Sequence, residues 1–180
     1  MYNDEAFYRK CINSGIILDA NVLTTFLVGK YAGKNAIINH KRAKYHGYIN
    51  GDYDALDWIV SKACRIITTR YILSQVSDFY PLENMGGGRK INSDAVVDDI
   101  NNIMIEDCNN IETLSKRIDT KRFGYADSSI IEIAMKDYAI VTVDGKLLGY
   151  LNEMKAAVVG MERLRVMFAE MNKSLEAFRN

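Results

Sequence analysis

The chain of 180 residues is 48 % hydrophobic, which suits one domain with a substantial core. Its 23 basic and 23 acidic residues leave no net charge, so the strongly basic composition of a nucleic-acid coat protein is excluded. No apolar stretch approaches the roughly 20 residues that cross a bilayer, the N-terminus has no apolar signal core, and the three distant cysteines form no CxxC pair. We therefore expect a cytoplasmic protein with reduced thiols and no membrane association.

Short apolar runs and amphipathic stretches organise the first half of the chain. They predict a strand at 16–20, a helix from 21 to about 31, a helix at 54–64, a strand at 65–68 and a helix at 69–80. Asp54 is expected to cap the second of these helices, and the single proline, Pro81, follows the end of the third. Residues 32–51 match neither a helical nor a strand pattern.

The second half of the chain follows a glycine run at 86–88. It predicts helices from 92 or 93 to about 109, at 111–118, at 124–138 and at 146–154, strands at 139–143 and 156–159, and an amphipathic helix at 163–178. Alternating strands and helices, without a repeat or linker, predict an α/β fold: a three-layer α/β/α sandwich around a central parallel sheet. We expect one domain over 1–180, with its core at about 15–160 and the C-terminal amphipathic helix in 161–180.

Three aspartates stand beside apolar runs in a way that indicates one site. Asp19 and Asp144 lie at the ends of predicted strands, and Asp127 falls in the first turn of a predicted helix. A parallel sheet gathers the C-terminal ends of its strands at one edge, where the following helices begin. Three carboxylates there would repel one another unless a cation neutralised them, and Mg²⁺ or Mn²⁺ prefers oxygen ligands. Taken one at a time, each aspartate also suits a helix cap or a turn.

A basic stretch follows Asp19, since no aspartate or glutamate occurs from Ala20 through Gly51. A cationic patch beside an acidic site is what a phosphodiester substrate requires. A solvated loop whose charges are balanced elsewhere in space fits this pattern equally well. Tyrosines near the stretch suit either stacking on unpaired bases or ordinary packing. The candidate RNA-binding cations are Lys30, Lys34, Lys41, Arg42 and Lys44, and the tyrosines are Tyr31, Tyr45 and Tyr48.

Four segments stand in a fixed order over residues 15–160: LDANVL (18–23), ITTRYILSQVSDF (67–79), YADSSIIEIA (125–134) and VTVDGKL (141–147). Together they resemble the PIN-domain family, metal-dependent ribonucleases of the wider 5′-nuclease-like fold. The resemblance implies a parallel sheet with helices on both faces, Mg²⁺ or Mn²⁺ at the acidic cluster, and hydrolysis of RNA. It implies metal ligation by Asp19, Asp127 and Asp144, orientation of ligands or water by Asn21 and Ser128, and support of the strand end by Thr142.

One position departs from the family's pattern. The family usually carries a glutamate on the helix after the second strand, and Gln75 stands there in this chain. A glutamine keeps the length and one carbonyl acceptor but not the negative charge, so it is a weaker ligand for a cation. Asp78, about one turn further along, is either a substitute ligand or a solvated helix acid. Gln75 is therefore expected to line the site as a neutral hydrogen-bonding residue and to weaken the binding of at least one metal ion.

These features together predict a metal-dependent endoribonuclease, in which activated water attacks phosphorus and leaves a 5′-phosphate. The resemblance leaves the setting open between an RNA-processing nuclease and the toxin of a toxin–antitoxin pair. A toxin implies an inhibitory protein partner, and a homodimer is a further expectation. The alternative is a catalytically impaired PIN-like module that binds RNA or a protein without cleavage. A haloacid-dehalogenase-like hydrolase is disfavoured, because Asn21 stands where that chemistry needs a second acid.

Overall fold

A computed structural model describes residues 4–34, 47–49, 51–77, 98, 101, 104–106, 111–116 and 118–179. Its strands are β1 (Ile16–Leu18), β2 (Ile66–Thr68), β3 (Met104–Glu106), β4 (Ala139–Thr142) and β5 (Ala157–Gly160). Its helices include α1 (Asp4–Asn13), α2 (Ala20–Ala32), α5 (Asp52–Lys62), α6 (Arg70–Ser77) and α8 (Ile111–Ser115). They continue with α9 (Ile118–Ala134), α10 (Gly145–Glu153) and α11 (Met161–Arg179).

The described strands form one sheet in the order β3-β2-β1-β4-β5, and every neighbouring pair is parallel. Strand β1 lies at the centre, with Ile17 opposite Ile67 of β2 on one side and Ile140 of β4 on the other. Each of β1, β2, β4 and β5 is buried along its whole length. Parallel strands covered on both faces need continuous apolar runs of this kind.

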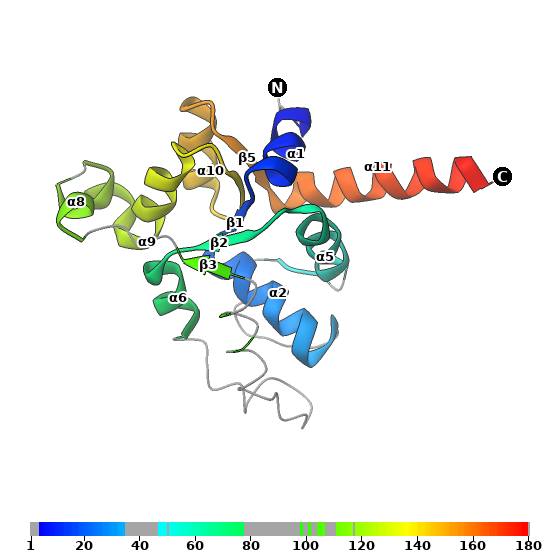
Figure 1. Ribbon diagram of the computed structural model, residues 1–180, viewed down its shortest axis with the longest axis horizontal. Helices are drawn as coiled ribbons and strands as arrows, with labels where there is room; N and C mark the ends of the chain where they lie inside the picture. The colour runs from blue at the N-terminus through cyan, green and yellow to red at the C-terminus, as the bar shows by residue number, and fades with distance from the viewer. Residues whose placement is uncertain are drawn as a thin grey trace.

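Helices cover both faces of this sheet, which confirms the predicted three-layer α/β/α sandwich. In Figure 1, α9 and α10 lie to the left of the sheet, and α1, α5 and α11 lie to its right. Helix α2 packs against α5 and α6, and α11 packs against α5. Buried side chains from α1 through α11 form one continuous hydrophobic cluster, which includes Phe7, Leu18, Leu56, Ile130 and Leu164.

The order of the strands creates a topological switch point beside β1, which we call the crevice. The chain leaves β1 toward β2 on one side of the sheet and leaves β4 toward β5 on the other. Right-handed crossovers in opposite directions place their helices on opposite faces, so the switch point lies at the carboxyl ends of β1 and β4. This is the position at which open parallel sheets bind their ligands.

Several predicted elements differ in extent from the observed ones. The predicted strand at 16–20 is too long, because Asp19 is already the N-cap of α2 and accepts a hydrogen bond from the Asn21 N–H. Asp54 is not the cap of α5, whose N-cap is Gly51, and it pairs with Lys34 instead. Of the predicted helix at 69–80, residues 78–80 lie outside the described residues.

Three larger differences come from short or interrupted segments. The continuous helix predicted to reach about 109 is wrong at Met104–Glu106, which pairs with β2 as an edge strand. The predicted helix at 124–138 is too long at its end, since α9 ends at Ala134 and a turn follows at 135–137; Gly124, with φ +81°, breaks α9 where the predicted helix begins. Helix α1 was not expected, because only Phe7 and Cys11 of its ten residues are buried and its apolar pattern is weak.

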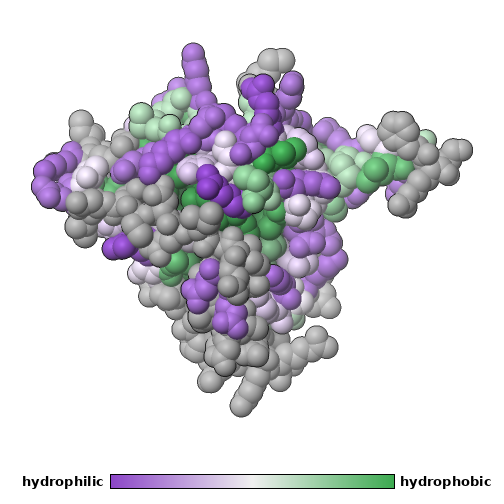
Figure 2. All heavy atoms as spheres, viewed as in Figure 1, coloured by the Kyte–Doolittle hydropathy of each residue, from purple (hydrophilic) through white to green (hydrophobic). Residues whose placement is uncertain are grey.

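Helix α11 closes the core only with its first half. Leu164 and Met167 are buried, whereas Val166 is 43 % and Leu175 is 51 % exposed. The C-terminal half projects away from the rest of the protein, and apolar residues appear on its surface (Figures 1 and 2). Across the part of the chain that the structure describes, no helix is long and apolar enough to span a membrane.

Candidate functional site

Asp19 lies at the carboxyl end of β1 and is tied to the neighbouring strand β4. Its backbone N–H donates to the Val141 carbonyl oxygen at 3.0 Å. One carboxylate oxygen, Oδ1, accepts from the Asn21 N–H at 2.8 Å. The other, Oδ2, accepts from the Thr142 hydroxyl and from the Val143 N–H at 3.3 Å. The side chain is only 5 % exposed, so these bonds fix its orientation in the crevice between β1 and β4.

Burial raises the pKa of Asp19, because a buried carboxylate loses the solvation that its charge receives in water. Hydrogen bonds from Thr142, Asn21 and Val143 act in the opposite direction and favour the ionised form. The protein therefore buries the Asp19 carboxyl group and supplies hydrogen-bond donors that stabilise its ionised form. Such opposed influences are typical of functional sites, although structural networks also produce them.

Thr142 joins Asp19 to Asp144. Its hydroxyl donates to Asp19 Oδ2 and accepts from the Asp144 N–H at 3.0 Å. Asp144 is exposed and caps α10, since its Oδ1 accepts from Lys146 N–H at 2.7 Å and Leu147 N–H at 2.9 Å. Both aspartates at strand ends are therefore helix caps, and they also belong to one hydrogen-bonded unit at the crevice.

Asp127 lies on α9, which packs against α10, the helix that Asp144 caps. The break at Gly124 starts a new helical segment three residues earlier, so Asp127 stands in its first turn. Burial, together with the negative charges of Asp19 and Asp144, raises the pKa of Asp127 to about 7. Both charges lie close enough to act on it, so the fold brings the three predicted aspartates to the same edge of the sheet.

Two hydroxyls near these elements have no hydrogen-bond partner among the described residues. Ser128, next to Asp127, is fully buried, and Thr68, at the carboxyl end of β2, is 1 % exposed. The neighbouring pair is satisfied, because Thr69 and Ser129 share a hydrogen bond of 2.8 Å. Carboxylates with nearby unsatisfied oxygens make a donor set that fits a hard cation. Among the residues that the structure describes, no three His, Cys, Asp or Glu side chains form a ready-made metal site.

The other predicted residues are less closely associated with the acids. Gln75 is exposed on α6, whose buried face carries Ile72 and Val76. Asn21 contributes its backbone N–H to Asp19 rather than a described side-chain contact. Tyr48 is 5 % exposed, which favours packing over base stacking for this residue. Lys34 pairs with Asp54, and the Lys30 ammonium lies 5.5 Å from the Tyr31 ring centre. Asp78, Lys41, Arg42, Lys44 and Tyr45 lie outside the described residues.

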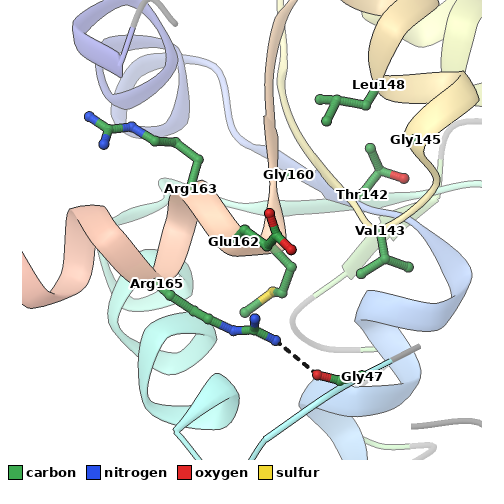
Figure 3. Close-up of a pocket in the computed structure, with 10 residues that line it drawn as sticks. Gly47, Thr142, Val143, Gly145, Leu148, Gly160, Glu162, Arg163 and Arg165 are labelled. Carbon is green, nitrogen blue, oxygen red and sulfur yellow. Dashed lines mark hydrogen bonds between the residues drawn. The ribbon is translucent and has the colours of Figure 1, made fainter. Parts of the chain in front are cut away.

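A cavity of about 350 Å³ opens beside the acids, and its wall includes Thr142, Val143 and Gly145. Its opposite side comes from the first turns of α11 and includes Glu162 and Arg165 (Figure 3). These two residues were missed: Arg165 fell in the helix predicted at 163–178 to close the core, and Glu162 stood in the short connection before that helix. Glu162 follows the end of β5 by two residues, as Asp144 follows the end of β4, so the rule that found Asp144 also applies to it.

Comparison of the chain with family models, with curated proteins and with solved structures gave no match. Support for a function therefore comes from the resemblance of the four segments and from the geometry of the crevice.

Changing Thr142 to valine should lower the free energy of unfolding by about 1–2 kcal/mol. The substitution keeps the shape but leaves the Asp144 N–H without its acceptor and Asp19 without a donor. Chemical denaturation measures the loss. Thr142→Ser should recover most of it because serine restores the hydroxyl, and equal losses in both variants would mean that packing of the methyl group dominates.

The pKa of Asp127 predicts a pH-dependent stability in the presence of a chelator. The folded state binds a proton between pH 3.8 and about 7 that the unfolded state has lost, so stability falls as pH rises through this window and is level above it. Asp127→Asn should therefore be more stable than wild type at pH 8 by about 1–2 kcal/mol, since the carboxyl is partly exposed. Urea unfolding at pH 4 and pH 8 measures the difference, and parallel curves for the two proteins would contradict the prediction.

Proposed function

We propose that the chain is a metal-dependent endoribonuclease whose active site is the crevice at the carboxyl ends of β1 and β4. The observation that carries this proposal is the unit in which Thr142 joins Asp19 to Asp144 at the crossover point of the sheet. Asp127 adds a third carboxylate whose charge interacts with the other two. The resemblance to the PIN-domain family supports the same reaction and supplies RNA as the substrate.

Asp19, Asp127 and Asp144 are the residues that would hold Mg²⁺ or Mn²⁺ in this proposal. When bound, the cation supplies a Lewis acid that activates water and offsets the charge of the phosphodiester. The chain's own residues perform the positioning. Thr142 and the Val143 N–H orient the Asp19 carboxylate, and the first turn of α10 holds Asp144 through two N–H groups. The three acids stand at strand ends and helix starts, so a rigid backbone rather than a flexible loop holds them in place.

The biological setting belongs to the same proposal. A cytoplasmic ribonuclease of this size would act either in RNA processing or as a toxin that an inhibitory protein restrains. Two copies of the chain would form a homodimer in either setting. Lys30 and Lys34 are the candidate cations for the RNA backbone that lie among the described residues; both are exposed, and Lys34 pairs with Asp54.

Gln75 supports a second candidate function. It is exposed and neutral on α6, where the family that the chain resembles usually has a carboxylate. A site with one charge fewer binds a divalent cation more weakly, which favours an impaired module that binds RNA or a protein without cutting it. The two candidates differ in one measurable property, the cleavage of a phosphodiester bond.

The experiment is incubation of the wild-type chain with 5′-labelled single-stranded RNA in Mn²⁺, in Mg²⁺ and in chelator. The nuclease proposal expects cleavage with either metal, products with a 5′-phosphate, and no cleavage in chelator. Absence of cleavage for RNA and for single-stranded DNA in both metals would reject the nuclease proposal and leave the binding module.

Changing Gln75 to glutamate should increase the affinity for Mn²⁺ by about tenfold and raise the cleavage rate. The change restores a negative charge to the helix beside the acids, and removal or addition of groups that tune a metal site typically alters affinity by 10–100-fold. Calorimetric titration with Mn²⁺ measures the affinity, and Ser74→Glu, on the same exposed face of α6, is the matched control for a general charge effect. Equal gains in both variants would show that position 75 has no special role.

A further inference from the structure

The cavity beside the acids has the size and position of a pocket for one nucleotide unit of a substrate. Its volume is about 350 Å³, which lies in the range of small-molecule sites. Thr142 and Val143 form its wall on one side and hold Asp19 on the other. Only Thr142, at the end of β4, and Val143 therefore separate a group in the cavity from Asp19. Figure 3 shows this arrangement, with Thr142 and Val143 on one side and Glu162 and Arg165 on the other.

Part of the cavity is suited to a flat, apolar ring. Val143, Leu148 and Met161 contribute apolar surface, and Gly145 and Gly160 contribute walls without side chains. A Cβ atom at Gly145 would meet nothing within 4 Å, so the space in front of this residue is open. A Cβ atom at Gly160 would come within 3.0 Å of Leu148, so the backbone and this side chain already approach closely there. Apolar walls around an open slot favour a nucleobase over a hydrated ion.

Two charged groups, Glu162 and Arg165, line the far side of the cavity. The Glu162 carboxylate points toward the Thr142 and Val143 side of the cavity, and its charge acts on Arg165 (Figure 3). Arg165 is held in place by Asp52, with bonds of 2.5 Å from Nε and 2.9 Å from Nη2, and by the Gly47 carbonyl oxygen at 3.2 Å. Because Nε and Nη2 make these three bonds, a ligand in the cavity would meet the Nη1 hydrogens. Arg163, by contrast, turns away from the cavity and pairs with Asp4.

We propose that this cavity binds a guanine base of the RNA strand, a specificity that rests on the proposed nuclease function. The Glu162 carboxylate accepts hydrogen bonds from guanine N1–H and the N2 amino group, and the Arg165 guanidinium donates to O6. Guanine is the base that presents two adjacent donors on its Watson–Crick edge. Adenine and cytosine offer one donor beside an acceptor nitrogen, and uracil offers one donor between two carbonyl oxygens. An acceptor-only carboxylate therefore favours guanine over all three.

The first test measures nucleoside binding in chelator, so that it needs neither metal nor cleavage. Guanosine should bind at least about tenfold more tightly than uridine, adenosine or cytidine, as expected for a paired hydrogen-bond contact. Inosine, which is guanosine without the N2 amino group, should lose most of this advantage. Titrations followed by NMR shifts measure the affinities, and equal binding of guanosine, inosine and uridine would overturn the proposal.

The matched variants test the role of Glu162. Glu162→Gln keeps the length of the side chain but replaces one acceptor oxygen with a donor, and it should lower guanosine affinity about tenfold and remove the difference from inosine. Glu153→Gln, an exposed acid on the neighbouring helix α10, should leave guanosine affinity unchanged. If Glu162→Gln weakens Mn²⁺ binding and leaves guanosine binding intact, Glu162 is a cation ligand and the guanine site is wrong.

A cleavage assay then separates the two proposals. In an RNA of uridines with one central guanosine, cleavage by wild type should concentrate at one bond with a fixed offset from the guanosine, and Glu162→Gln should spread it over several bonds. Cleavage without any relation to the guanosine would overturn the base pocket while the nuclease stands. Guanosine preference in the binding test with no cleavage of any RNA would reject the nuclease while the pocket stands.

Discussion

Changing Asp144 to asparagine should lower Mn²⁺-dependent cleavage of single-stranded RNA by about 100-fold or more. The substitution removes a negative charge from the proposed site, and loss of a direct ligand is expected to exceed the 10–100-fold effects of groups that only orient ligands. The substitution should not disturb the fold. Asp144 is exposed and caps α10, and asparagine is as good an N-cap as aspartate, so the helix start is retained.

The control is Asp57→Asn, an exposed acid on α5, far in sequence from the proposed site. Its cleavage rate should equal that of wild type, and both variants should unfold within about 0.5 kcal/mol of wild type, as is usual for surface changes. Cleavage that persists in Asp144→Asn at the wild-type rate would remove this aspartate from the reaction. A similar loss in Asp57→Asn would mean that overall charge, rather than the site, controls the activity.

Changing Asp52 to alanine should lower the free energy of unfolding by about 3 kcal/mol. Asp52 is fully buried, accepts from the Ile49 N–H at 2.7 Å, and pairs with Arg165 through both carboxylate oxygens. Removal of one partner from a buried pair leaves the other charge without compensation, which typically costs about 3–5 kcal/mol. We use the lower end of this range because the Arg165 side chain is 29 % exposed.

Asp54→Ala on the same helix is the comparison for this prediction. Its pair with Lys34 is exposed on both sides, at 38 % and 50 %, and such pairs contribute at most about 1 kcal/mol. Urea denaturation measures both variants. A loss in Asp52→Ala no larger than that in Asp54→Ala would show that the buried pair contributes little, and the guanosine titration of Asp52→Ala would then report whether Arg165 still reaches the cavity.

The layered architecture was predictable because its strands have a simple pattern. β1, β4 and β5 are short, mainly apolar runs buried on both faces, and at most two residues separate each from the helix that follows. β3 was not predictable on the same grounds. Its three residues form an edge strand, and Met104 also continues the helical spacing of the segment before it, so only the pairing with β2 decides their conformation.

Some residues of the candidate site were predictable from the sequence and others were not. Asp19 follows the end of β1 by one residue and Asp144 follows the end of β4 by two, so topology alone predicted them at one edge of the sheet. Glu162 follows a strand end as well, but the strong periodicity of α11 favoured a purely structural reading. The pair between Asp52 and Arg165 was beyond sequence reasoning, since 113 residues separate its members and no local spacing connects them.

The hydrogen bond from Thr142 to Asp19 joins residues that lie 123 positions apart in the chain, and this separation affects how the protein folds during its synthesis. Closing so long a loop carries a large entropic penalty, so contacts of this kind form after local structure has already appeared. During synthesis, Asp19 leaves the ribosome long before its partner on β4 exists. The nascent chain therefore cannot assemble the crevice until Thr142 has emerged, and any truncation ahead of this residue leaves the Asp19 carboxylate without the hydroxyl that orients it.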